Sequence, residues 1–436
     1  MNTTAPLRLA IIGLGTVGAG VIRLLEANRE LVARRAGRPI EVVAISARDR
    51  NKDRGVDLSR YEWVDDMSTL AGRDDIDTVV ELIGGSDGPA LTLARQCLGQ
   101  GKPFVTANKA MIAHHGLDLA REAERTGVAL KYEAAVAGGV PVIKGLREGA
   151  AANRIMRVYG ILNGTCNYIL STMERDGSAF ADVLEEAQAK GYAEADPTFD
   201  IDGIDAAHKL SILASLSFGT EIDFPSVDIT GIRHVLAADI REAAALGYRV
   251  RLIAMAECEE DGGENVGLFQ RVHPMLVPVD HPLAHVDGAL NAVVAEGNFV
   301  GRLFFQGAGA GEGPTASAVV ADVIDVARDE YGPAFAMPAE WLQRQVKADG
   351  GARIGRAYLR FLVQDRPGVL AEITAAMRDA DVSIESVIQR PASDDDAVLV
   401  AIVTHAGALS CIQDVLERLG GSDSLMGEPM VMHILD

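Results

Sequence analysis

The chain has 436 residues, which is enough for two or three domains that each bury a core of their own. With 48% hydrophobic and 24% charged residues, its composition is that of a globular protein rather than a disordered one. The net charge of −21 argues against nucleic acid and anionic membrane surfaces as partners.

Four widely spaced cysteines, none of them in a C-x-x-C pair, predict free thiols in a reducing compartment. Glycines interrupt the apolar stretch over residues 9–22, so we expect neither a transmembrane segment nor a signal peptide. These features predict a cytoplasmic protein without a membrane partner.

A short β-type run over residues 7–12 leads into a glycine-rich turn, and the residues up to about 35 favour a helix. The turn has the pattern G-x-G-x-x-G between a strand and a helix, the context in which it binds a dinucleotide. A pyrophosphate can then approach the free N–H groups of the helix. The alternative is an ordinary glycine-rich turn. The candidate cofactor-binding residues are Gly13, Leu14, Gly15, Thr16, Val17 and Gly18.

The second predicted strand, residues 40–46, is followed by Arg48 rather than by an acid that would bind the adenosine ribose 2′-hydroxyl. An arginine suits a 2′-phosphate, so Arg48 favours NADP over NAD. Asp49 is adjacent and able to bind the ribose instead, and a solvated loop arginine is the alternative interpretation.

Strands and helices alternate over residues 1–132, which predicts a doubly wound parallel sheet. Lys109 follows a predicted strand, at the edge where such sheets bind ligands. Glu133 and the small residues up to Val140 then leave the sheet. They suit a hinge between domains or, as a weak pattern, a hard cation held by a carboxylate and carbonyl groups.

Residues 154–320 lose this regular alternation and predict an α+β domain with helices over a sheet. Asp202 is a candidate N-cap for a helix over residues 203–218, which would place Asp205 and Lys209 on one helix face. A solvated salt bridge is the alternative, although the rest of that helix is apolar. The preceding stretch is rich in acids: Glu194, Asp196, Asp200, Asp202 and Asp205.

Residues 163–167 form a predicted turn into a helix, rich in hydrogen-bond donors for a polar substrate. Cys166 in this turn suggests a thiol nucleophile, but no motif with a base accompanies it, and we interpret it as structural. His281 and His285 have no third ligand nearby for zinc. A second glycine-rich loop, residues 307–313, precedes another predicted helix.

The end of the chain predicts a small separate domain. Residues 331–354 form a linker with helical content near residues 341–347, and residues 355–436 then predict the element order βαββαβ. The motif D-R-P-G-V-L lies at its first turn, beginning at Asp365.

The residues from Ala187 onward, A-Q-A-K-G-Y-A-E-A-D-P-T-F-D-I-D-G-I-D-A-A-H-K, resemble the signature of the homoserine dehydrogenases. T-A-N-K-A around Lys109 matches that family as well, and the last domain resembles an ACT domain. The resemblance covers nearly the whole chain and implies an NAD(P)-binding Rossmann domain (1–132), a substrate and catalytic domain (133–330) and a regulatory ferredoxin-like ACT domain (355–436). The signature positions are matched at Ala187, Gly191, Pro197, Asp200, Gly203, Asp205 and Lys209.

The resemblance implies reversible oxidation of L-homoserine to L-aspartate 4-semialdehyde with NAD or NADP, in threonine, methionine and isoleucine biosynthesis. In this scheme Lys209 is the acid/base, Asp205 positions the two lysines or the substrate, and Lys109 supplies a second cation and binds both substrate and cofactor. Glu194 would bind the substrate's ammonium group, and the substrate would also contact Asp200, Asn163 and Thr165. Gly311 and Glu312 would lie near the nicotinamide, and a monovalent cation (Na⁺ or K⁺) would bind Glu133, Val136, Gly138 and Val140.

ACT domains bind amino acids at interfaces between subunits, so the resemblance also implies a homodimer or homotetramer. Asp365 and Gly368 would bind the effector, for which we expect L-threonine as a feedback inhibitor; the alternative is a pure oligomerisation domain. A non-catalytic nucleotide and amino-acid sensor is the rival function, but it would not need the lysines and acids of the signature. A phosphorylating semialdehyde dehydrogenase would need an activated Cys166.

Overall fold

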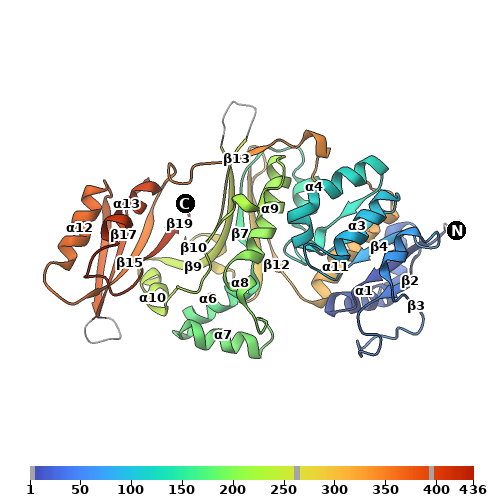
Figure 1. Ribbon diagram of the computed structural model, residues 1–436, viewed down its shortest axis with the longest axis horizontal. Coiled ribbons are helices and arrows are strands. Elements are labelled where there is room, and N and C mark those ends of the chain that lie inside the picture. Colours follow the sequence, from blue (N-terminus) through green and yellow to red (C-terminus); the bar gives the residue numbers. More distant parts are fainter. Residues whose placement is uncertain (1–4, 260–265, 392–396) are drawn as a thin grey trace.

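The computed structural model describes residues 5–259, 266–391 and 397–436. The molecule is elongated, with an N-terminal domain at one end, a C-terminal domain at the other and a central domain between them (Figure 1). This arrangement confirms the predicted fold class, a doubly wound domain followed by an α+β domain and a βαββαβ domain.

The N-terminal domain is built on a parallel sheet of order β3-β2-β1-β4-β5-β6. Alternate residues of β1 enter two different cores, because α1 (Thr16–Ala27) and α2 (Arg29–Ala36) cover one face and α3 (Pro89–Gly99) and α4 (Lys109–Thr126) cover the other. The strands are β1 (Leu7–Ile12), β2 (Ile40–Ser46), β3 (Glu62–Trp63), β4 (Thr78–Glu81), β5 (Phe104–Thr106) and β6 (Leu130–Lys131).

Helix α11 (Glu312–Ala327) belongs structurally to this N-terminal sheet, although it follows the central domain in sequence. Its buried residues Val319 and Val323 share a core with Ile11 and Val21. The central domain that we expected over residues 133–330 therefore contains a helix that packs on the sheet of the N-terminal domain. The chain therefore crosses between the two domains twice.

A mixed sheet of eleven strands runs through the central and C-terminal domains. One edge of β10 (Val266–Pro278) pairs with β9, and its other edge pairs in turn with β13 (Gln345–Lys347), β8 (Asp228–Ile229) and β19. The expected helix near residues 341–347 is thus wrong: β10 offers an open edge, and residues 345–347 pair with it. The other central strands are β7 (Ile155–Ile161), β9 (Tyr248–Glu259), β11 (Leu290–Gly297) and β12 (Gly301–Ala308).

Helices cover this sheet on the side of the cleft, with α9 lying against β7, β9 and β10 (Figure 1). Twelve of the fifteen residues of α9 are buried, from Asp205 through Leu216. The central helices are α5 (Val142–Lys144), α6 (Gly164–Asp176), α7 (Phe180–Ala189), α8 (Thr198–Ile201), α9 (Ile204–Phe218) and α10 (Ala237–Ala245).

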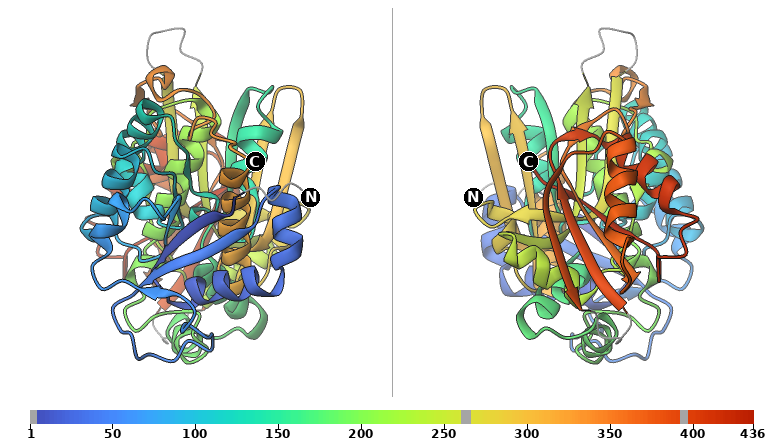
Figure 2. Two further views of the ribbon diagram at one scale, coloured as in Figure 1. Left: turned by 90° about the vertical axis from the view of Figure 1, so that its right-hand side faces the viewer. Right: turned by 90° about the vertical axis from the view of Figure 1, so that its left-hand side faces the viewer.

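The C-terminal domain has the predicted order βαββαβ, and its two helices lie on one face of its strands (Figure 2). It docks on the central domain through Asp239 of α10, which accepts a 2.9 Å hydrogen bond from Arg360 and one of 3.1 Å from Tyr358. The elements are β15 (Ala357–Gln364), α12 (Val369–Asp379), β16 (Ile384–Pro391), β17 (Ala397–Thr404), α13 (Leu409–Leu419) and β19 (Met430–Ile434). No helix in the described part of the chain is long and apolar enough to span a membrane.

Candidate active site

The glycine-rich turn between β1 and α1 has the geometry that a dinucleotide needs. Gly13 has φ +92°, and a Cβ there would lie 2.5 Å from the carbonyl oxygen of Leu82. A Cβ at Gly18 would lie 2.1 Å from the carbonyl oxygen of Gly13, whereas a Cβ at Gly15 would meet nothing within 4 Å. The space over Gly15 therefore stays open at the start of α1, where no side chain caps the free N–H groups.

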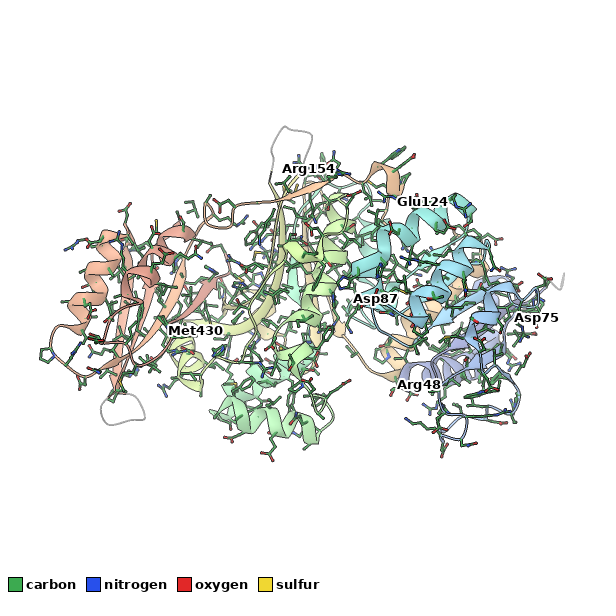
Figure 3. The ribbon with its side chains drawn as sticks, in the orientation of Figure 1. Arg48, Asp75, Asp87, Glu124, Arg154 and Met430 are labelled. Carbon is green, nitrogen blue, oxygen red and sulfur yellow. The ribbon has the colours of Figure 1, made fainter. Side chains whose placement is uncertain are left out.

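Arg48 lies exposed just beyond the end of β2, on the surface of the N-terminal domain (Figure 3). Arg54 is a neighbour that our sequence analysis missed: its Nε donates to the carbonyl of Leu14 (2.8 Å), and its guanidinium lies 5.8 Å from the ring centre of Trp63. The sequence signal that could have identified Arg54 was the density of basic residues from Arg48 to Arg54. Both arginines border the side on which the adenosine half of a dinucleotide would lie.

Glu312 begins α11 and forms an ion pair with Arg23 of α1. A Cβ on Gly20 would lie 2.6 Å from Cγ of Glu312, so α1 and α11 approach closely here. Gly311, with φ +112°, provides the turn into α11. These two residues therefore link the second glycine-rich loop to the first helix of the nucleotide-binding turn.

Lys109 occupies the first turn of α4, immediately after β5. Asn108 caps this helix by accepting a hydrogen bond from the backbone N–H of Met111 (3.1 Å). The hydroxyl of Thr106 accepts from the N–H of Asn108 (2.9 Å) and donates to Glu81 at the tip of β4 (2.5 Å). This chain of bonds fixes the end of the sheet from which the Lys109 side chain reaches the central domain.

The side chains of Lys109 and Lys209 meet at one carboxylate, that of Asp205. Lys109 Nζ lies 3.1 Å from Oδ1, and Lys209 Nζ lies 2.7 Å from Oδ2. Lys209 Nζ also donates to the carbonyl of Leu162 (2.7 Å), and Asn163 Nδ2 donates to Asp205 Oδ2 (2.8 Å). The predicted pairing of Asp205 and Lys209 on one helix face is present, and it is buried rather than solvated.

Gly203, in the left-handed conformation with φ +86°, precedes α9 and occupies its N-cap. The expected N-cap, Asp202, instead forms an ion pair with Arg233. Asp202 still belongs to the preceding turn, because its N–H donates to the carbonyl of Thr198, the first residue of α8. The start of α9 is thus set by a glycine and not by a side-chain cap.

Asp200 is the second carboxylate of the site. Asn163 Nδ2 donates to it (2.8 Å) and the hydroxyl of Thr165 lies 3.3 Å from it, so the two predicted substrate-binding residues of the 163–167 turn converge here. Glu194 is exposed, and its carbonyl accepts from the amide of Gln188 (3.0 Å). The structure therefore brings Asp200, Asn163 and Thr165 together and leaves the carboxylate of Glu194 in solvent.

The charges of this cluster shift its pKa values in a consistent pattern. The negative charge of Asp205 raises the pKa of Lys109, against the opposing effect of burial. Burial alone would raise the pKa of Asp205, but Lys209 and Lys109 together hold it well below its usual range. Burial and the charge of Asp205 raise the pKa of Asp200.

A cleft of about 380 Å³ opens between the two domains beside this cluster. Lys109, Phe199 and His208 line it, together with Gly84 and Gly85 after β4. His208 Nε2 lies 3.2 Å from His114 Nε2 of α4, and burial followed by the neighbouring His114 lowers the pKa of His208 to about 4. Phe199 and His208 lie within the signature stretch, but nothing in their residue types marked them as lining the site.

Cys166 is buried, and its thiol lies 3.2 Å from the carbonyl of Asp200. Burial and the nearby carboxylates raise its pKa well above the usual value, so the thiol is kept neutral. His281 contacts the hydroxyl of Tyr159 (3.1 Å). Among the described residues no group of three or more His, Cys, Asp or Glu side chains is arranged to bind a metal.

Comparisons with known proteins agree with this geometry. The homoserine dehydrogenase NAD-binding domain family matches residues 13–133, and the homoserine dehydrogenase catalytic family matches residues 141–324. Homoserine dehydrogenases of Pseudomonas aeruginosa and Neisseria gonorrhoeae are 44% and 42% identical, covering 97% and 96% of both chains in each pair. The chain belongs to the homoserine dehydrogenase family.

Solved structures point to the same family. A homoserine dehydrogenase from Thiobacillus denitrificans is 41% identical and superimposes with a TM-score of 0.92 over 100% of both chains. A hyperthermophilic archaeal homoserine dehydrogenase in complex with NADPH is 27% identical, with a TM-score of 0.64 over 76% of this chain and 100% of that one. The enzyme is thus an NAD(P)-dependent oxidoreductase of amino-acid biosynthesis that interconverts L-homoserine and L-aspartate 4-semialdehyde. The alternative function, a non-catalytic sensor, is therefore wrong.

The expected cation site of this homoserine dehydrogenase surrounds Glu133, whose two carboxylate oxygens accept the backbone N–H groups of Ile143 (3.1 Å) and Lys144 (2.9 Å). Burial, followed by the charge of Asp322, raises the pKa of Glu133 to about 7. Gly138 has φ +45°, and a Cβ there would lie 2.5 Å from the carbonyl oxygen of Gly309. The tight turn, together with a buried carboxylate whose charge its neighbours do not fully balance, fits a hard cation bound by oxygen ligands.

Residues 357–421 match the ACT domain family. Gly368, with φ +99°, precedes α12, and Asp365 is exposed in the turn before it. Arg366 in the same turn donates to the hydroxyl of Ser424 (2.7 Å), which in turn donates to Glu372 (2.7 Å). The turn is therefore held by the domain's own side chains while Asp365 stays accessible. An ACT domain in a homoserine dehydrogenase implies regulation by an amino acid.

Proposed function

We propose that Lys209 is the acid/base of the homoserine dehydrogenase reaction and that Asp205 positions it. An ammonium group has three N–H bonds, and those of Lys209 already have two fixed acceptors, Asp205 and the carbonyl of Leu162. One N–H remains for the substrate oxygen. In the direction of reduction it donates a proton to the aldehyde oxygen, and in the direction of oxidation the amine accepts the hydroxyl proton.

Lys109 has a different role, because its side chain is one-third exposed and borders the cleft. Its raised pKa keeps it charged, so it suits binding of the substrate and of the cofactor rather than proton transfer. Asp200, held by Asn163 and Thr165, would bind the substrate's ammonium group, and Glu194 would assist from the rim. When bound, NAD(P)⁺ supplies the hydride acceptor.

The cofactor would be NADP in preference to NAD, because an exposed arginine, Arg48, and no acid follows β2 at the position that discriminates the 2′-phosphate. The nucleotide turn is Gly13, Leu14, Gly15, Thr16, Val17 and Gly18, and Gly311 and Glu312 would close the second loop over the nicotinamide. A Na⁺ or K⁺ ion would be bound by Glu133 and the carbonyl groups of Val136, Gly138 and Val140.

Regulation would come from L-threonine bound near Asp365 and Gly368, in a cytoplasmic homodimer or homotetramer. Such a site needs a carboxylate for the effector's ammonium group and free N–H groups at a helix start for its carboxylate. The turn before α12 offers both.

The observation that carries the assignment of roles is the shared carboxylate of Asp205, which holds lysines from two domains at one cleft. The test is the rate of NADP⁺ reduction by L-homoserine in Lys209→Ala and Lys109→Ala variants. We expect Lys209→Ala to lower kcat with little change in cofactor affinity, and Lys109→Ala to raise KM for both substrates. The roles are wrong if Lys209→Ala turns over homoserine at nearly the wild-type rate.

A further inference from the structure

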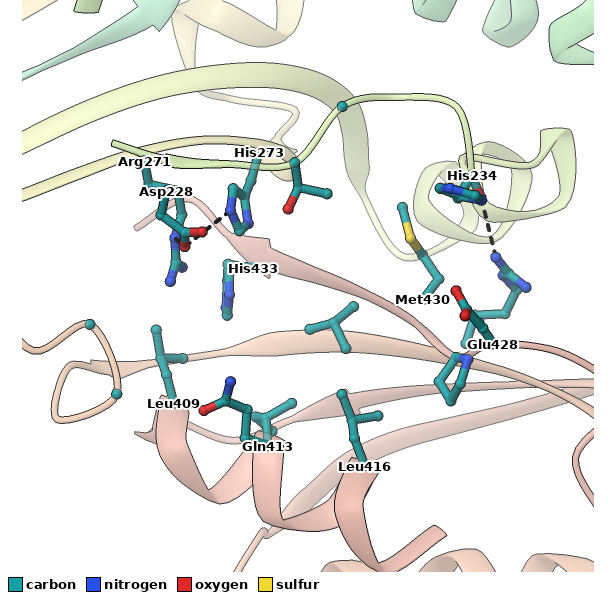
Figure 4. Close-up of a pocket in the computed structure, with 18 of the residues that line it drawn as sticks. Asp228, His234, Arg271, His273, Leu409, Gln413, Leu416, Glu428, Met430 and His433 are labelled. Atoms are coloured by element: carbon teal, nitrogen blue, oxygen red, sulfur yellow. Dashed lines mark hydrogen bonds and ion pairs between the residues drawn. The ribbon is translucent and has the colours of Figure 1, made fainter. Parts of the chain in front are cut away.

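A cavity of about 830 Å³ lies between the central and C-terminal domains, away from the active site (Figure 4). Strands β8 and β10 and the segment after β8 form the wall on the central side, and β15, β19 and α13 form the other wall. Neither the active-site lysines nor Asp365 and Gly368 line it. The volume falls within the range of small-molecule sites, which is roughly 300–1,000 Å³.

One end of the cavity carries a cluster of charged and polar side chains. Asp228 Oδ2 lies 3.3 Å from Arg271 Nε and 3.1 Å from His273 Nε2, and the rings of His273 and His433 are stacked with their centres 6.2 Å apart. Lys347 is a second cation on this wall. The two cations face a single carboxylate, so this end has a net positive charge in a strongly acidic protein.

His433 adds an unused hydrogen-bonding atom to this end. Its Nδ1 is buried and has no hydrogen-bond partner among the described residues. Burial, followed by the charge of Arg271, lowers the pKa of His433 to about 3, so its ring stays neutral. A neutral imidazole beside a buried guanidinium offers an N–H to an anion without adding charge. An unpaired buried polar atom is costly unless a ligand or water pairs with it.

The wall formed by α13 is apolar apart from Gln413. Leu409, Ile412 and Leu416 project from one face of α13, and Leu236 and Met430 lie across from them. Figure 4 shows Leu409 below the polar cluster, and Leu416 and Met430 further toward the other end. An aliphatic body of a ligand would be buried against these side chains, while a charged group would face Arg271 and His433.

The central wall of the cavity touches the catalytic segment directly. Gly231 lines the cavity, and a Cβ there would lie 2.3 Å from the carbonyl oxygen of Ile201 and 2.5 Å from Cα of Asp202. The N–H of Ile232 donates to that same carbonyl (2.8 Å). Ile201 ends α8, which carries Asp200, and the next helix carries Asp205. The backbone that carries the two carboxylates of the active site is thus in direct contact with this wall.

We propose that this cavity binds a small carboxylic acid with an aliphatic body, and that the occupied cavity alters homoserine binding through the contact of Gly231 with Ile201. The carboxylate pairs with Arg271, Lys347 and His433, and the aliphatic body lies against α13. This site is separate from the one proposed for L-threonine and does not depend on the roles assigned to the active-site lysines. Asp228 would also accept an ammonium group, so the ligand is either an amino acid or a simple carboxylic acid.

Calorimetric titration of the full chain distinguishes an amino acid from a simple carboxylic acid as the ligand. L-Leucine and 4-methylpentanoate share one carbon skeleton and differ in the ammonium group, whereas L-leucinamide keeps the skeleton and lacks the carboxylate. We expect saturable binding of at least one of the two acids, and at least tenfold weaker binding of L-leucinamide. Titration up to about 10 mM detects even millimolar affinity. The proposal fails if neither acid binds at that concentration, or if L-leucinamide binds equally well.

Two surface variants test whether the ligand binds in this cavity. Gln413 is exposed on α13 and lines the cavity, whereas the neighbouring Asp414 is exposed and does not. Gln413→Trp should fill the cavity and weaken binding at least tenfold, while Asp414→Trp should leave it within twofold. Lys347→Ala should weaken the binding of the two acids but not the binding of L-leucinamide. Equal effects of the two tryptophan variants would overturn the location.

The coupling is tested by homoserine kinetics at saturating concentrations of the acid that binds. We expect KM for L-homoserine to change more than twofold in the wild-type enzyme and not in Gln413→Trp, with KM for NADP⁺ unchanged. An unchanged KM for L-homoserine in the wild-type enzyme would overturn the coupling. The calorimetric result does not require turnover, so it stands apart from any failure of the active-site assignments.

Discussion

Lys109 of the N-terminal domain and Asp205 of the central domain form an ion pair of 3.1 Å across the cleft between the two domains. The second oxygen of Asp205 is bound by Lys209, one helical turn further along α9. The carboxylate therefore sets the distance between a lysine at the end of the nucleotide-binding sheet and a lysine of the substrate domain. The ion pair across the cleft and the orientation of Lys209, the proposed acid/base, depend on the same residue.

Replacement of Lys209 tests the acid/base assignment. Lys209→Ala should lower kcat by roughly 10²–10⁴-fold, the usual contribution of a positioned proton-transfer group. Steady-state assays with L-homoserine and NADP⁺ measure this loss, and fluorescence titration with NADPH should show nearly unchanged affinity. Lys190→Ala is the matched control, because Lys190 is an exposed lysine that pairs with Glu186 on α7. If kcat of the Lys209 variant stays within a few-fold of the wild type, Lys209 only supports packing.

The shared carboxylate should also govern the pH profile. Because Asp205 raises the pKa of Lys109 above its ordinary value, Lys109 stays charged through neutral and moderately alkaline pH. Asp205→Asn removes that negative charge, so the alkaline limb that reflects Lys109 should move to lower pH in plots of log(kcat/KM). Asp182→Asn, on the exposed side of α7, should leave the profile unchanged. A profile of Asp205→Asn that coincides with the wild type contradicts the electrostatic role of Asp205.

Arg48 should determine the preference for the phosphorylated cofactor. Arg48→Ala should raise KM for NADP⁺ by roughly tenfold, equivalent to about 1.4 kcal/mol, and should hardly affect KM for NAD⁺, which has no 2′-phosphate. Initial rates with both cofactors provide the measurement. Arg34→Ala, at the end of α2, is the control for loss of a surface arginine. Equal changes for both cofactors would mean that Arg48 contacts a part common to the two.

The cation site can be tested through stability rather than activity. The pKa of Glu133 is about 7 in the folded chain, above its ordinary value near 4.5, so the folded chain binds this proton more tightly than the unfolded one. The associated stability is present below pH 4.5 and is lost as pH rises through 7. A bound cation would offset that loss, so KCl or NaCl should raise Tm relative to choline chloride more at pH 8 than at pH 5.

The matched variants for that experiment are Glu133→Gln and Glu148→Gln. The first removes the carboxylate, and the cation-specific rise in Tm at pH 8 should disappear. The second alters an exposed carboxylate that pairs with Arg147 and should keep the rise. A cation effect that survives in Glu133→Gln would locate the ion elsewhere.

The predicted inhibition by L-threonine is tested at the turn before α12. Asp365→Ala should raise the threonine concentration for half-inhibition about tenfold, because the effector's ammonium group loses its charged partner. Asp423→Ala is a control on an exposed acid of the same domain. Inhibition that is identical in Asp365→Ala and the wild type would place threonine at another site.

Deletion of residues 350–436 should leave an active core that threonine no longer inhibits. The structure shows what such a deletion removes: β19 from the edge of β10, and Arg360 from the buried carboxylate of Asp239. An unpaired buried carboxylate costs several kcal/mol. Asp239→Asn in the truncated chain would reduce that cost, so its activity should be compared with that of the full-length enzyme.

The sequence by itself determined the features that depend on short-range geometry. The spacing of Gly13, Gly15 and Gly18 predicts a tight turn at a helix start, and four-residue spacing places Asp205 and Lys209 on one helix face, since both follow from local backbone conformation. The order βαββαβ was predictable for the same reason. The Asp202 cap and the helix near residues 341–347 were wrong, because Gly203 and the open edge of β10 satisfy the backbone differently.

Only the tertiary structure decided which distant residues meet. It brings Lys109 to Asp205, returns α11 to the N-terminal sheet, and pairs β19 with β10 to enclose the cavity around Arg271 and His433. These contacts depend on burial of apolar faces that are far apart in the chain, and local periodicity does not specify the partner of such a face. The pKa shifts of Lys109 and Glu133 depend on the same packing, because burial and neighbouring charges, and not residue type, produce them.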